Sequence, residues 1–106
     1  MAWVFLGFAG LFEVVWATSM KMSAGFTKIG PTAITILAMI VSFTFLSLSL
    51  KALPLGTAYA IWTGIGAAGA FVVGVMFMGE ALTFGRAISI LLLVSGIVGL
   101  KLSSGV

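Results

Sequence analysis

Charged positions divide the chain into long apolar stretches. Residues 29–50 and 52–79 carry no charge, and residues 1–20 carry a single one. A membrane-spanning helix needs roughly 20 largely apolar residues, because the hydrocarbon core of a bilayer is about 30 Å thick. The pattern therefore predicts four transmembrane helices. They cover about residues 2–20, 31–50, 56–78 and 86–104.

A β-barrel is the other structure that can cross a bilayer, and it requires alternating apolar and polar positions. That alternation is absent, and runs such as residues 90–94 are evenly apolar. We therefore expect an all-α membrane protein with one four-helix transmembrane domain over residues 1–106. The first helix lacks a preceding basic segment and carries an acid, so we do not expect it to be a cleaved signal peptide.

The amino-acid composition excludes several classes of function. Hydrophobic residues make up 62% of the 106 positions and charged residues only 7%, whereas soluble domains are about 25% charged. This excludes a soluble enzyme and a disordered segment, and five cations are too few for a nucleic-acid-binding patch. The chain has no Cys and no His. We therefore expect no enzyme activity, no metal, no cofactor and no nucleic-acid partner.

The basic residues are nearly balanced across the predicted bilayer. Four spans place both termini, Lys51 and Lys101 on one side, and Lys21, Lys28 and Arg86 on the other. Orientation follows the Lys and Arg excess on the cytoplasmic side, and a difference of one gives almost no bias. The balance suggests insertion in both orientations and an antiparallel homodimer. A single orientation, set by a bias that the count misses, remains an open alternative.

Glu13 is the only charged residue deep inside a predicted span. An acid there costs roughly 2.5–3.5 kcal/mol on insertion scales. We favour a proton or cation site over the alternative, a structural acid held by interhelical hydrogen bonds. Glu80 follows Gly79 between two spans, and there we expect a solvated loop acid or local cap.

Residues three and four apart share a helix face, and the face of Glu13 holds Gly10 and Trp16. A small residue, an acid and an indole together indicate a cavity wall, although Trp16 alone is also typical of an interfacial anchor. The third predicted helix has a polar-aromatic stripe with Tyr59 and Trp62. Their O–H and N–H groups need partners in hydrocarbon, and their rings can face a cation.

Ser42 lies in the middle of the second predicted span. Its hydroxyl can bond to an acid on a neighbouring helix or back to its own helix, and the sequence leaves both options open. Phe43 and Phe45 follow it and are candidates to admit or exclude bulky substrates.

The motif G-x-G-x-x-G occurs at Gly64, Gly66 and Gly69. It binds dinucleotides only after a strand and at the start of a helix, whereas here it lies inside an apolar span. We expect these glycines to permit close helix packing or flexibility of the helix.

Small residues also line the fourth predicted helix, which contains no acid and no aromatic residue. Such stripes bring helices together in lipid. We assign them mainly to dimerisation, with packing inside the monomer as the alternative. The residues concerned are Gly85, Ser89, Ser95, Gly96, Gly99 and Ser103.

Three stretches carry a family resemblance: GLFEVVWA at residues 10–17, GFT at 25–27 and PLGTAYAIWTGIGA at 54–67. On these residues the chain resembles the small multidrug resistance family of bacterial four-helix transporters, over essentially its whole length. The third stretch is similar to the guanidinium-exporter subtype. The subtype that exports polyaromatic cations tends to have Ser where Thr63 stands.

The resemblance implies an antiparallel, dual-topology homodimer in the bacterial inner membrane that exports guanidinium ions in exchange for protons by alternating access. It implies that both copies of Glu13 share one site as the proton and substrate carboxylate. The other roles it implies are a pocket floor at Gly10 and Trp16, hydrogen bonds to Glu13 from Ser42 and Trp62, and a cleft lined by Tyr59. An exporter of quaternary ammonium or other drug cations is the alternative within the family. A structural or assembly subunit is a further alternative, which Glu13 argues against.

Overall fold

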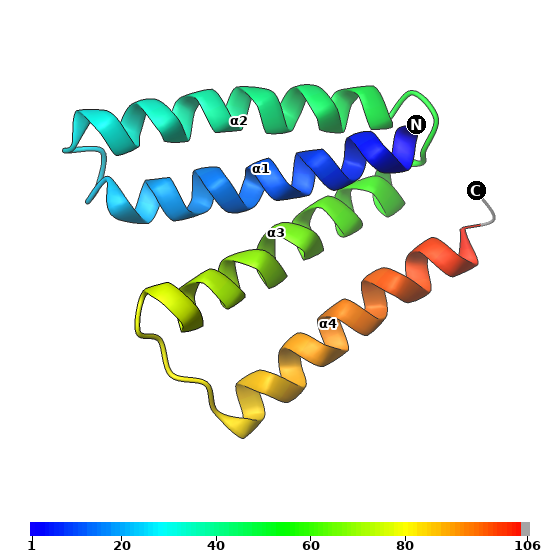
Figure 1. Cartoon of the computed structure of the whole chain (residues 1–106). Helices are drawn as coiled ribbons and strands as arrows, with labels where there is room; N and C mark the ends of the chain where they lie inside the picture. Colours follow the sequence, from blue (N-terminus) through cyan, green and yellow to red (C-terminus); the bar gives the residue numbers. More distant parts are fainter. Residues whose placement is uncertain (105–106) are drawn as a thin grey trace.

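The computed structural model describes residues 1–104, and within that range it contains four α-helices and no strand (Figure 1). Each helix is long and apolar enough to cross a membrane. The predicted all-α fold with four membrane-spanning helices is therefore confirmed. The helices are α1 (Ala2–Met22), α2 (Ile29–Ser49), α3 (Leu55–Phe77) and α4 (Phe84–Ser103).

The helix ends differ from the predicted ones by one or two residues, for local reasons. α1 runs two residues further, which places Lys21 in its last turn, where a cation interacts favourably with the helix dipole. α2 starts earlier and includes Pro31 in its first turn, where a missing N–H is tolerated. α4 starts two residues early because the Thr83 side chain caps it by accepting a 3.2 Å hydrogen bond from the backbone N–H of Arg86.

α1 is the central helix of the subunit. It packs along α2 on one side and against α3 on the other, whereas the α4 backbone lies next to α3 only (Figure 1). The start of α1, the α2–α3 connection and the last turn of α4 lie at one end of the molecule. The α3–α4 connection lies at the opposite end. Three helices thus form a packed unit, and the fourth is attached at its edge.

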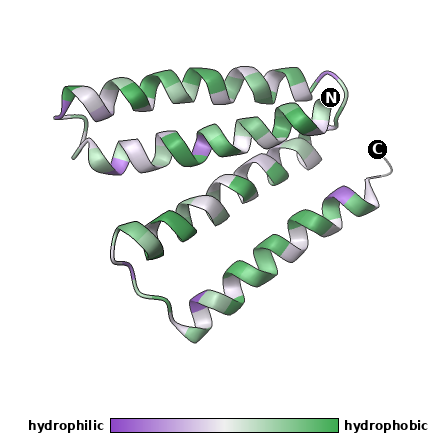
Figure 2. Cartoon of the chain, viewed as in Figure 1, coloured by the Kyte–Doolittle hydropathy of each residue, from purple (hydrophilic) through white to green (hydrophobic). Residues whose placement is uncertain are grey.

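Few side chains are buried, and they lie where α1, α2 and α3 meet. The apolar core contains Leu6, Ala9, Ile61 and Trp62, and no residue of α4 is buried. Figure 2 shows hydrophobic residues along all four helices, including their outward faces. Exposed apolar surface on this scale marks a membrane or protein contact rather than a water-facing surface. The subunit is therefore a multi-pass membrane protein.

Two glycines of α3 allow neighbouring helices to approach closely. A Cβ atom at Gly64 would lie 2.5 Å from Cδ1 of Ile97 on α4, and one at Gly69 would overlap Val14 on α1. Small residues permit this approach in membranes. The structure thus supports close packing at these two positions. Because α3 is continuous over residues 55–77, the predicted flexibility stays a prediction.

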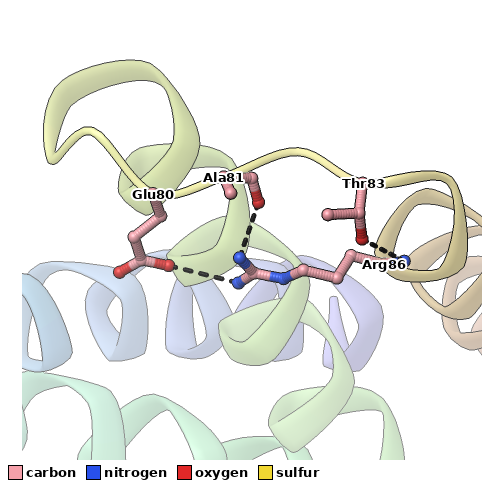
Figure 3. A network of polar contacts seen from close by, with 4 residues as sticks. All are labelled: Glu80, Ala81, Thr83 and Arg86. Atoms are coloured by element: carbon pink, nitrogen blue, oxygen red, sulfur yellow. Dashed lines mark hydrogen bonds and ion pairs between the residues drawn. The ribbon is translucent and has the colours of Figure 1, made fainter.

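Arg86 holds the connection between α3 and α4 (Figure 3). Its Nη1 donates a 2.6 Å hydrogen bond to the carbonyl oxygen of Ala81, and its Nη2 lies 3.4 Å from Oε1 of Glu80. Its guanidinium carbon also lies 5.2 Å from the ring centre of Phe71. Both members of the ion pair are more than 40% exposed, so the pair contributes about 0–1 kcal/mol. Glu80 is therefore an exposed loop acid, as predicted.

The glycines in the stripe of small residues on α4 have no close neighbour among the described residues. A Cβ atom at Gly85, Gly96 or Gly99 would meet nothing within 4 Å. Ser95 is exposed, and Ser89 donates its hydroxyl to the Gly85 carbonyl of its own helix at 2.8 Å. The alternative that these glycines pack within the monomer is therefore wrong, and their role in dimerisation stays a prediction.

We predict that Gly10→Ala destabilises the subunit by about 1–3 kcal/mol, the usual cost of overpacking. Its Cβ would lie 2.7 Å from Cβ of Ile65, an atom fixed to the α3 backbone. Gly7→Ala is the matched control on the same helix, where a Cβ meets nothing within 4 Å. This control should gain up to about 1 kcal/mol from helix propensity. Equal stability of both variants in detergent unfolding experiments would contradict the packing described here.

Candidate functional site

Glu13 lies in the middle of α1 and faces α3. Its carboxyl group lies directly against Gly66, so that a Cβ atom at that glycine would overlap it. The Oε1 atom is buried and finds no hydrogen-bond partner in the part of the chain that the structure describes. A buried polar atom without a partner is destabilising, and an ionised one far more so. The predicted alternative of an acid held by hydrogen bonds within the subunit gains no support at this oxygen.

Trp16 stands one turn further along α1 and shares this property. Its Nε1 atom is buried and has no acceptor among residues 1–104. A carboxyl oxygen and an indole N–H on one helix face thus both retain hydrogen-bonding capacity. The carboxyl oxygen can accept hydrogen bonds from the donors of a ligand, and the indole can present its ring face to a cation.

An aromatic row leads from Trp16 across the three packed helices. Its ring centre lies 6.4 Å from that of Phe43 on α2, which lies 5.7 Å from that of Trp62 on α3. Trp62 in turn lies 5.4 Å from Tyr59, whose side chain is largely exposed. The structure therefore brings three predicted site residues into one row that runs from the buried face of α1 to the surface of α3.

Ser42 links all three helices of the packed unit. Its hydroxyl donates a 2.7 Å hydrogen bond to the carbonyl oxygen of Ala9 on α1 and accepts a 3.0 Å hydrogen bond from Nε1 of Trp62 on α3. The back-bond to its own helix is therefore wrong. The hydrogen bonds from Ser42 and Trp62 to Glu13 are also not formed in this structure. Each group has a single proton to donate, and each proton already has another acceptor.

Gly10 has a different neighbour from the one expected. It faces Ile65, so it sets the distance between α1 and α3 one turn from Glu13. Its predicted place in a pocket floor stays a prediction.

Two groups in this region were not identified as site residues from the sequence. Phe43 was considered only as a size filter, yet its ring lies between the rings of two tryptophans. The Ala9 carbonyl has no signal in the sequence, because every residue carries one. Phe45 is separate from this row: its ring lies 5.6–6.1 Å from three phenylalanine rings of α1.

Within residues 1–104 no cluster of three or more His, Cys, Asp or Glu side chains could hold a metal ion. The groups that the structure places in this region are the carboxyl group of Glu13 and the rings of the aromatic row.

We predict that Ser42→Ala destabilises the subunit by about 1–3 kcal/mol, because the buried Trp62 N–H loses its acceptor. Unfolding in detergent, followed by tryptophan fluorescence, measures the loss. Thr44→Ala is the matched control, since Thr44 is exposed and bonds only to the Ile40 carbonyl of its own helix at 2.7 Å. If both variants lost the same stability, the interhelical link would have no special weight.

Comparison with known proteins identifies the family of this chain. The family described as Small Multidrug Resistance protein matches residues 1–93. Proteins named guanidinium exporter from Citrobacter freundii and Salmonella typhimurium are 53% identical over 104 residues, which cover 98% of this chain and 99% of each relative. The guanidinium exporter of Escherichia coli K12 is 51% identical over the same length. The chain therefore belongs to the small multidrug resistance family.

Proposed function

We propose that this protein exports guanidinium and small guanidinyl cations across the bacterial inner membrane in exchange for protons, by alternating access. The observation that carries the proposal is the buried Oε1 of Glu13, which lacks a partner within the described residues and could accept hydrogen bonds from a cation. Guanidinium exporters at 51–53% identity over nearly the full chain support the substrate class.

Guanidinium suits this site chemically. It is planar, permanently charged at neutral pH, and offers pairs of N–H donors that fit a carboxylate in a bidentate manner. The rings of Trp16 and Trp62 flank Phe43 and can stabilise a cation by their faces. Glu13, Trp16 and Trp62 are thus the proposed binding residues, with Ser42 fixing the indole of Trp62 and Tyr59 at the open end of the row.

Competition explains the coupling to protons. Two carboxylates that lie close together in an apolar site cannot both be ionised cheaply. We propose that two copies of Glu13 share the site, which is then filled either by protons or by one cation. A carrier performs antiport if its site opens alternately to the two sides of the membrane and the protein changes between these two states only when the site is filled.

An antiparallel homodimer supplies the second carboxylate. We base the proposed homodimer on the nearly balanced Lys and Arg residues and on the stripe of small residues on α4. Gly96 and Gly99 are the proposed contact residues, since a Cβ at either position meets nothing within 4 Å, together with the exposed Ser89 and Ser95. Flexing of α3 at Gly64, Gly66 and Gly69 is the proposed motion between the two access states.

The aromatic row favours one second candidate. Four rings from Trp16 to Tyr59 offer apolar and cation-binding surface that also suits a quaternary ammonium ion. Such a substrate lacks N–H donors and would gain nothing from the hydrogen-bonding capacity of Glu13.

We predict that Glu13→Gln abolishes proton-driven guanidinium transport in liposomes, because an amide neither ionises nor exchanges a proton near neutral pH. In the unmodified protein, guanidinium binding should weaken as the pH falls, since protonation removes the charge that binds the cation. Currents on a solid-supported membrane and tryptophan fluorescence at several pH values measure both effects.

Glu80→Gln is the matched control, since this acid is exposed in the α3–α4 connection and should leave transport near its original level. Proton-coupled transport by Glu13→Gln would refute the proposal. Equal currents from guanidinium and tetrapropylammonium would favour the second candidate instead.

We predict that single cysteines at Ala52 and Ala81, exposed positions in connections at opposite ends of the subunit, are each labelled from both sides of the membrane. The chain has no native cysteine, so a membrane-impermeant maleimide reports each position alone. Labelling each cysteine from one side only would rule out the antiparallel arrangement.

A further inference from the structure

A narrow apolar groove runs between α1 and α4 on the side of the subunit away from α2. Its volume is about 220 Å³. Leu6 and Gly7 form one wall, Ile97 forms the other, and Ile61 and Ile65 of α3 form the floor. The groove exists because the backbones of α1 and α4 are not adjacent and each of them packs against α3.

A cation stands at one end of the groove. The ammonium group of Lys101 lies 5.0 Å from the ring centre of Trp3, and both residues line the groove. Lys101 belongs to the last turn of α4 and Trp3 to the first turn of α1, so the pair stands at the end of two membrane spans. Tryptophan and lysine are the residues that occupy the headgroup level of a bilayer.

The charged side chains at this end of the molecule, among the residues that the structure describes, are all basic. Lys51 lies in the α2–α3 connection at the same end. The two acidic residues of the sequence lie elsewhere: Glu13 is in the middle of α1, and Glu80 is in the connection at the opposite end. An anion at the mouth of the groove would therefore meet the ammonium group of Lys101.

We propose that this groove binds one acyl chain of an anionic phospholipid, whose phosphate is held by Lys101. The apolar walls match a hydrocarbon chain, and the single cation matches the charge at the start of that chain. Basic pockets between transmembrane helices are known lipid headgroup sites in general. The proposal does not rest on the proposed transport function.

The test is native mass spectrometry of the full-length protein in detergent, titrated with dioleoyl phosphatidylglycerol or dioleoyl phosphatidylcholine. We expect about fivefold tighter binding of phosphatidylglycerol, the factor for one lysine near an anionic headgroup. Lys101→Gln should reduce this ratio to about one. Lys51→Gln, the control at the same end but outside the groove, should retain the fivefold preference. An unchanged ratio in Lys101→Gln would overturn the proposal.

A second pair of variants tests the groove itself. Gly7→Leu should place a side chain in the groove, because Gly7 lines it and a Cβ there meets nothing within 4 Å, and binding of both lipids should fall at least fivefold. Gly30→Leu is the control, since Gly30 is equally open but lies in the first turn of α2, and it should bind lipid normally. Unchanged lipid binding by Gly7→Leu would overturn the proposal. So would a loss of dimers by Gly7→Leu in the same spectra, which would identify a second copy as the occupant.

Discussion

The close approach of α1 to α3 is the constraint on which the rest of the structure depends. At three successive contacts a glycine on one helix receives a larger side chain from the other. The pairs are Gly10 with Ile65, Glu13 with Gly66, and Val14 with Gly69. Helical spacing places each set on one face. Because both helices contribute small residues, their backbones come close enough to enclose the carboxyl group of Glu13, which a longer separation would leave open to lipid.

The contact between α1 and α3 also determines which groups a side chain of α2 can reach. With α1 and α3 fixed against each other, the hydroxyl of Ser42 reaches the Ala9 carbonyl on one helix and the Trp62 indole on the other. The link satisfies a buried indole N–H that hydrocarbon cannot satisfy. It also fixes the ring of Trp62 beside Phe43. The orientation of the Trp62 ring is therefore a consequence of one hydroxyl on a neighbouring helix, and that hydroxyl is not donated to Glu13.

The sequence predicts the helices well because each apolar segment between charged residues must be long enough to cross the bilayer. Local effects at Lys21, Pro31 and Thr83 move the ends by one or two residues, and such effects are hard to rank from sequence alone. Glu13 was identifiable because an acid in mid-span is expensive. The partners of Ser42 were not, since the Ala9 carbonyl is a backbone group, and the choice between several acceptors depends on helix rotation. The position of Phe43 between two tryptophans depends on that same rotation.

The contrast between α4 and the other helices follows from where small residues are placed. Glycines on α1 and α3 face larger side chains inside the subunit, whereas Gly96 and Gly99 on α4 face nothing. The subunit therefore has one satisfied set of close-packing positions and one set without a neighbour. Packing alone explains the first set. The second gains nothing within a single chain, because glycine weakens a helix interior unless something packs against it. The same reasoning applies to Glu13, because its buried Oε1 finds no partner within the described residues and therefore gains nothing from its position in an isolated chain.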